Sequence, residues 1–143
     1  MKLRIALAVN QKNEFERNYF GNAEKYLIYE QTQNKVQFRS EEINYIKSLG
    51  KDYLPDSEKK GKALINFLKE KNIHVLVSSD YCRNIGMLNR HFIPIRILLK
   101  QKNDIVREIG NRLFWIADEW NHNALEFKLF TIRSGIVKTK IEE

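Results

Sequence analysis

The sequence predicts an α/β domain built on one mixed β-sheet of about five to six strands, with helices on its faces. Two observations favour this class: three strand-like segments come first, and helix-like and strand-like segments then alternate. The chain has 143 residues, 43% hydrophobic and 30% charged, which is ordinary for one globular domain with its own core. Since no stretch resembles a linker or a repeat, residues 1–143 should form a single domain.

The first half of the chain predicts three strands in succession. The first is the apolar run at residues 3–9, and the second is the aromatic and β-branched segment at residues 26–29. The third covers residues 35–39, where Val36 and Phe38 alternate with polar neighbours, as in a strand with one wet face. A tight polar connection joins the second to the third, so the three strands should form a meander.

A helix and a buried strand come next. The helix should begin after Asp56 or Ser57, because either side chain can accept a hydrogen bond from a free N–H of the first turn. Its apolar residues have helical spacing and predict one buried face, made of Ala63, Leu64, Phe67 and Leu68. Residues 73–77 are almost continuously apolar, which predicts a central strand covered on both faces.

A short helix from residue 81 to about residue 90 and a strand at residues 92–97 follow. Pro94 lacks the N–H that a ladder needs. The strand should therefore lie at an edge of the sheet, or Pro94 should fall among its first residues.

The last part of the chain predicts one long helix and a final strand. Asn103 or Asp104 should cap a helix over residues 105–120, whose apolar stripe should be core: Ile105, Ile109, Leu113, Ile116 and Trp120. Residues 124–133 predict a strand with three apolar residues on one side, Leu125, Phe127 and Leu129. This strand could pair within the domain or across a homodimer, and the charged tail at 138–143 is expected to fray.

The charge pattern favours a solvated basic surface. The formal net charge is +7, but the cations are spread in short groups, with no run of five and no ribonucleoprotein-type motif. Nucleic acid is therefore an unlikely partner, and an acidic protein is a possible one. Cys82 is the single cysteine, so no internal disulfide can form, and the first apolar stretch is too short for a signal peptide or a membrane span. We expect a cytoplasmic protein with no membrane partner.

One segment carries a family resemblance: Tyr19-Phe20-Gly21-Asn22-Ala23-Glu24-Lys25-Tyr26-Leu27-Ile28-Tyr29-Glu30. It resembles the hallmark of the dinitrogenase iron-molybdenum cofactor biosynthesis family, a His-Phe-Gly turn, a small residue and an aromatic strand, with Tyr19 at the histidine position. The resemblance covers about residues 1–120 and leaves 121–143 as a C-terminal extension. It implies a ribonuclease H-like fold and, as in nitrogen fixation accessory members, a non-catalytic role in binding or carrying an iron-sulfur or iron-molybdenum type cluster.

The candidate site combines the family segment with the turn after the central strand, because ligands of open α/β sheets bind outside the carboxyl ends of the strands. Cys82 would be the first metal ligand, since a thiolate binds soft metals, and His91 could be a second. The predicted cofactor-binding residues are Tyr19, Phe20, Gly21, Ser79 and Cys82. Phe20 and Gly21 also have a structural interpretation, as a core residue and a tight turn.

Two further interpretations of the same turn remain. Ser78, Ser79 and the following backbone amides, with Arg83, could bind a small anion. The basic surface could instead make the chain a protein- or nucleic-acid-interaction module with no metal ligand. A nuclease would need several convergent carboxylates, whereas residues 3–9 carry none and only Asp80 follows the central strand. The sequence therefore predicts a binding protein and not an enzyme.

Overall fold

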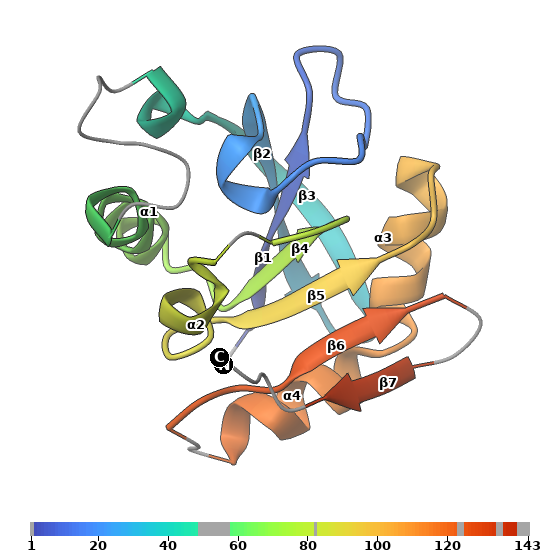
Figure 1. Cartoon of the computed structure of the whole chain (residues 1–143). Helices are drawn as coiled ribbons and strands as arrows, with labels where there is room; N and C mark the ends of the chain where they lie inside the picture. The colour runs from blue at the N-terminus through green and yellow to red at the C-terminus, as the bar shows by residue number, and fades with distance from the viewer. Residues whose placement is uncertain (1, 49–57, 82, 123–124, 134–135, 140–143) are drawn as a thin grey trace.

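The computed structural model describes residues 2–48, 58–81, 83–122, 125–133 and 136–139. They form one mixed sheet of seven strands in the order β3-β2-β1-β4-β5-β6-β7 (Figure 1). The strands are β1 (Arg4–Val9), β2 (Lys25–Thr32), β3 (Lys35–Ile43), β4 (Val75–Ser78), β5 (Ile93–Ile97), β6 (Leu129–Ile132) and β7 (Ile136–Thr139). The α/β class and the mixed sheet are confirmed. The sheet has one strand more than expected, because part of the tail expected to fray forms β7.

The strands of the middle of the sheet run parallel. β1 pairs with β4, β4 with β5 and β5 with β6 in parallel, while β2, β3 and β7 are antiparallel additions at the two sides. The carboxyl ends of β1, β4, β5 and β6 therefore lie along one edge of the sheet, where a ligand site is expected. The predicted meander of the first three strands is confirmed.

Helices cover both faces of this sheet (Figure 1). They are α1 (Glu58–Glu70), α2 (Ile85–Leu88), α3 (Lys102–Gly110) and α4 (Leu113–Asn121), with 3-10 turns η1 (Phe20–Asn22) and η2 (Tyr45–Ser48). One buried cluster joins α3 and α4 to the sheet, and a second joins α1, α2 and η1 to its other face. Val75, Leu76 and Val77 are fully buried between them, so β4 is the predicted central strand. Within the described part of the chain, every helix is too short or too polar to span a lipid bilayer.

The single long helix expected at residues 105–120 is wrong. The structure has two helices, because α3 ends at Gly110 and the N–H of Asn111 turns back to the carbonyls of Arg107 and Ile109. Glycine and asparagine are weak helix formers, which allows the break there. The N-cap is Gln101, and not Asn103 or Asp104. The stripe is nevertheless core, as predicted: four members are buried and Trp120 is partly buried.

The edge position considered for the strand that holds Pro94 is wrong, because β5 lies between β4 and β6. The N–H of Ile93 donates to the carbonyl of His74 in the β4 direction, so the neighbouring Pro94 faces β6. Pairing with β6 begins only at Ile95, opposite Phe130. The missing N–H therefore falls before that ladder starts. Pro94 is the second residue of β5, which confirms the alternative expectation.

The final predicted strand is shorter than expected, and of its three predicted apolar residues Phe127 is buried and Leu129 partly buried, whereas the expectation for Leu125 is wrong. Leu125 is 92% exposed, and Phe130 and Ile132 of β6 are buried in the same cluster as Phe127. The segment before β6 is held by Asn89, whose carbonyl accepts from the N–H of Phe127 and whose side chain donates to the Phe127 carbonyl. β6 pairs inside the domain with β5. The short helix is also reduced to α2, and the predicted caps Asp56 and Ser57 lie outside the described residues.

Candidate functional site

The loop before η1 is bound directly to the carboxyl end of β4. The Ser79 hydroxyl accepts from the N–H of Asn18 at 2.8 Å, and the Ser78 hydroxyl donates to the Asn18 carbonyl at 3.1 Å. The N–H of Phe20 donates to the carbonyl of Asp80 at 3.1 Å. The two predicted segments therefore do lie side by side, as the sequence suggested. Both serine hydroxyls are engaged in the hydrogen bonds that hold the loop.

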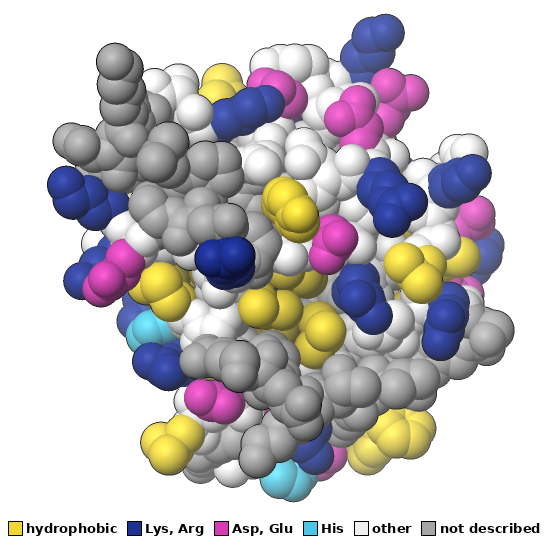
Figure 2. Space-filling view, viewed as in Figure 1, with side chains coloured by type: hydrophobic (Ala, Val, Ile, Leu, Met, Phe, Trp, Pro, Cys, Tyr) yellow, Lys and Arg dark blue, Asp and Glu magenta, His cyan; other side chains and the backbone are white. Residues whose placement is uncertain are grey.

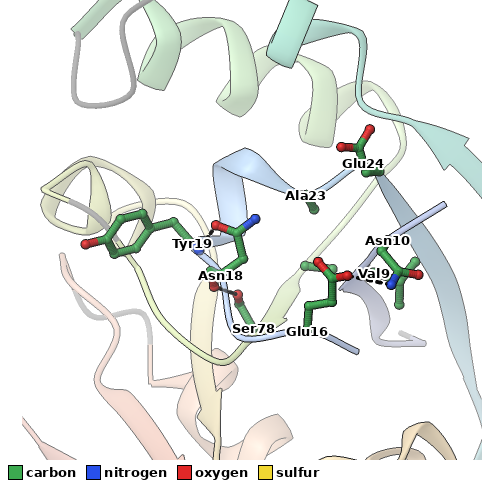
Figure 3. Close-up of a pocket in the computed structure, with 9 residues that line it drawn as sticks. Val9, Asn10, Glu16, Asn18, Tyr19, Ala23, Glu24 and Ser78 are labelled. Carbon is green, nitrogen blue, oxygen red and sulfur yellow. Dashed lines mark hydrogen bonds between the residues drawn. The ribbon is translucent and has the colours of Figure 1, made fainter. Parts of the chain in front are cut away.

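The space directly between these segments is too small for a cofactor. Its volume is about 30 Å³, and β1, the loop before η1 and Ser78 line it (Figure 3). That is room for about one or two water molecules. Figure 3 also shows the ring of Tyr19 directed away from the other lining residues, and this side chain is 42% exposed.

Phe20 and Gly21 belong to the core turn η1. The Phe20 ring is fully buried and stacks on Tyr26 and Tyr81, with ring centroids 4.7 and 6.0 Å away. The Tyr26 hydroxyl donates to the Phe20 carbonyl at 2.8 Å, and the buried Asn44 amide donates to the Gly21 carbonyl at 3.0 Å. No glycine in the described part of the chain has a positive φ, so Gly21 is not required for its backbone angle. The contacts of Phe20 and Gly21 are therefore those of residues that stabilise the fold.

The histidines lie away from the carboxyl edge. His91 precedes β5 and His74 precedes β4, so both are at the amino ends of strands whose carboxyl ends adjoin Ser79. His122 is exposed beyond α4, and Cys82 lies outside the described residues. No group of three His, Cys, Asp or Glu side chains that could hold a metal occurs in the described ranges.

His74 makes a structural hydrogen bond. Its Nδ1 accepts from the N–H of Arg4 at 2.9 Å, and its ring packs edge-on against Trp120 at 4.7 Å. Burial, with the nearby Arg4 charge, lowers the pKa of His74 below its ordinary value. The hydrogen bond and the lowered pKa therefore both favour the neutral form of this ring in the folded protein.

Stability should consequently fall in acid. The unfolded His74 takes up a proton at about pH 6.5, whereas the folded ring resists it. Its contribution is therefore full above about pH 6.5 and is lost as the pH falls toward the lowered folded pKa. Burial also lowers the pKa of His91, so the effect of His74 is only part of the decline.

Urea unfolding at about pH 7.5 and 5.5 should show a smaller drop in the free energy of unfolding for His74→Gln than for the wild type. The exposed His122→Gln is the control, and equal drops in wild type and His74→Gln would contradict the assignment.

A larger pocket opens beside the bound loop, at the carboxyl ends of β4 and β5. Its volume is about 620 Å³, and it is lined by Phe15, Arg17, Ser79, Asp80 and residues 96–100. This size is typical of small-molecule sites. Of the predicted site residues, Ser79 lines it, while Tyr19, Phe20, Gly21 and His91 do not. We call it the β4–β5 pocket.

The β4–β5 pocket is positively charged. Arg17, Arg96 and Lys100 line it against one carboxylate, Asp80, which already accepts a hydrogen bond from the N–H of Tyr81 at 2.8 Å. No ion pair within the described ranges involves these three cations. The Nε of Arg96 is buried without a hydrogen-bond partner in the described structure. A buried, unsatisfied guanidinium N–H is unfavourable, and an anion would satisfy it.

Figure 2 shows Lys and Arg side chains around the side of the molecule where β5 ends and α3 begins, with hydrophobic and acidic side chains among them. This grouping is not visible in the sequence because Arg17 and Lys100 are 83 residues apart in the chain. The only local signal was Arg96, a cation inside an otherwise apolar strand. Comparison of the chain with protein-family models and with curated proteins finds no match.

Proposed function

We propose that this chain is a non-catalytic binding domain that holds a small organic anion in the β4–β5 pocket. The observation that carries the proposal is Arg96, which lines this pocket and whose buried Nε has no hydrogen-bond partner in the described structure. Hydrogen bonds between a guanidinium and an anion are short and strong, so a bound anion would compensate for the burial. The apolar lining from Phe15, Leu98 and Leu99 favours an anion with a hydrophobic part.

A binding role without catalysis fits the polar groups of this pocket. Asp80 is the one carboxylate that lines it in the described structure. The Ser79 hydroxyl is hydrogen-bonded to the Asn18 backbone, so it is not paired with a base. Acid-base or two-metal chemistry requires further convergent groups.

The family resemblance remains a separate proposal. A meander followed by parallel strands supports a ribonuclease H-like assignment, and a nitrogenase-accessory role would be compatible with a binding domain. We propose the anion and not the metal as the ligand, because Arg17, Arg96 and Lys100 line the β4–β5 pocket. A cytoplasmic location is supported by the single cysteine and remains a prediction.

The test is binding of phenyl phosphate, which combines an anionic and an apolar part, measured by isothermal titration calorimetry. Arg96→Gln should weaken binding by about tenfold or more, because it removes a hydrogen bond between charged groups. The matched control is Lys35→Gln, which removes the same charge from the β2–β3 turn at the other end of the sheet. Equal affinity in the two variants, or no binding by the wild type, would refute the proposal.

A further inference from the structure

A second hollow lies directly beside the β4–β5 pocket. Its volume is about 530 Å³, and it is lined by Lys12, Asn13, Glu14, Phe15 and residues 100–103. Phe15 and Lys100 line both hollows. The two hollows are therefore neighbouring parts of one surface feature, which runs along the carboxyl edge of the sheet to the start of α3. We call it the edge groove.

Cations dominate both parts of the edge groove. Its lining includes Lys12, Arg17, Arg96, Lys100 and Lys102. The two acidic side chains that line it are already engaged: Asp80 accepts from the N–H of Tyr81, and Glu14 accepts from the Asn10 amide at 3.3 Å. Lys102 also interacts with Glu41. The groove therefore offers positive charge at both ends, which fits a ligand with several separate negative groups.

An aromatic ring stands where the two parts meet. Phe15 packs on the hydrophobic core, is only partly buried and is a lining residue of both hollows. Leu98 is 50% exposed beside it. Cations along a groove with an aromatic ring between them are the pattern by which proteins bind single strands, where phosphates meet the cations and a base stacks on the ring.

We propose that the edge groove binds a short segment of single-stranded nucleic acid, contrary to the expectation from the spread of cations along the sequence, because the fold brings these cations together. This inference rests on the proposed function, because the anion held by Arg17, Arg96 and Lys100 would be one phosphate of the strand. A second phosphate would lie near Lys12 and Lys102, with a base against Phe15. An acidic peptide would supply charge but no planar group for this ring, so it is the less favoured ligand. Recognition through phosphates and stacking would be largely independent of base sequence.

The experiment measures fluorescence anisotropy of a labelled oligothymidylate of about eight nucleotides. Thymidine monophosphate and an oligoglutamate of similar length serve as competitors. We expect the oligothymidylate to bind at least about tenfold more tightly than the monophosphate, because it occupies both hollows. Its affinity should also fall with salt, with a log-log slope of about −0.7 for each phosphate contacted. Oligoglutamate that competes as well as unlabelled oligothymidylate would overturn the inference.

Variants locate the binding. Lys12→Gln with Lys102→Gln should weaken oligothymidylate binding by about tenfold and reduce the salt slope by about one. Phe15→Leu, which keeps an apolar side chain in the core, should weaken it at least about fivefold through lost stacking. The control, Lys35→Gln with Lys59→Gln, removes the same net charge outside the groove. Thermal unfolding of each variant checks that it is folded.

The outcomes separate the two proposals. If phenyl phosphate binds in an Arg96-dependent way but the groove variants behave like the control, the nucleic-acid inference fails and the proposed function stands. If oligothymidylate binding depends on Lys12 and Lys102 but neither probe depends on Arg96, the proposed anion site fails. If neither probe binds, both fail.

Discussion

Replacing Phe20 by alanine is expected to lower the free energy of unfolding by about 3–5 kcal/mol, the usual cost of removing a buried phenyl ring. Phe20 is fully buried, and its ring stacks between Tyr26 and Tyr81. Alanine would leave a cavity under η1, lined by large rings that cannot collapse far into it. Urea unfolding at neutral pH measures the loss, and the midpoint should fall with little change in slope.

The neighbouring residue supplies the control. Tyr19 is 42% exposed, so Tyr19→Ala should change stability by only about 0.5 kcal/mol or less. Phe20→Leu should remain folded and should bind phenyl phosphate like the wild type, because Phe20 does not line the β4–β5 pocket. A Phe20→Leu protein of normal stability that no longer binds the probe would show that the aromatic-glycine segment contributes to the ligand site.

The elements that could be predicted from the sequence are those in which the spacing of apolar residues follows directly from which faces of the element are buried. Residues 75–77 of β4 are apolar without a break because both faces of the strand are covered, and the stripe from Ile105 to Ile116 repeats at helical spacing because one face is buried. Such patterns need no knowledge of distant segments. They survive even where the helix itself is broken at Asn111.

The errors occurred where a distant segment decides the local structure. Pro94 left open an edge strand or a place among the first residues of a strand; its missing N–H matters only where a neighbour pairs, and pairing of β5 with β6 begins only at Ile95. Phe127 was assigned to a strand, whereas Asn89 takes its backbone hydrogen bonds. Both outcomes depend on tertiary contacts that periodicity does not report.

The candidate site was only partly predictable for the same reason. Its location at the carboxyl ends of the parallel strands follows from the topology, and Ser79 does line the β4–β5 pocket. The cations come from the loop after β1, from β5 and from the segment after β5, so a search for basic runs cannot detect them. The family resemblance predicted Tyr19 and Phe20 as site residues, but their contacts in the described structure are outside that pocket.

Tyr81→Phe is expected to destabilise the fold by about 1–3 kcal/mol, because it leaves buried polar groups without a partner. The Tyr81 hydroxyl donates toward the carbonyls of Leu76 at 3.1 Å and Ile95 at 2.9 Å, and it accepts from the N–H of Ile95 at 3.2 Å. It thus links β4 to β5 just before both strands reach the pocket. The exposed Tyr45→Phe is the matched control, with an expected change of about 0.5 kcal/mol or less.

The same phenol should make the free energy of unfolding fall at alkaline pH. Burial raises the pKa of Tyr81 well above its ordinary value, although the hydrogen bond to the Ile95 carbonyl acts in the opposite direction. The unfolded phenol ionises at about pH 10, so the contribution of Tyr81 is full below about pH 10 and is lost as the pH rises toward the raised folded pKa. Burial also raises the pKa of Tyr29, so part of the decline will remain in Tyr81→Phe.

Urea unfolding at about pH 8 and 10.5 should therefore show a smaller drop in the free energy of unfolding for Tyr81→Phe than for the wild type or Tyr45→Phe. Equal drops in all three proteins would mean that Tyr81 ionises as readily in the folded state as in the unfolded chain, which a hydroxyl held between β4 and β5 would not allow.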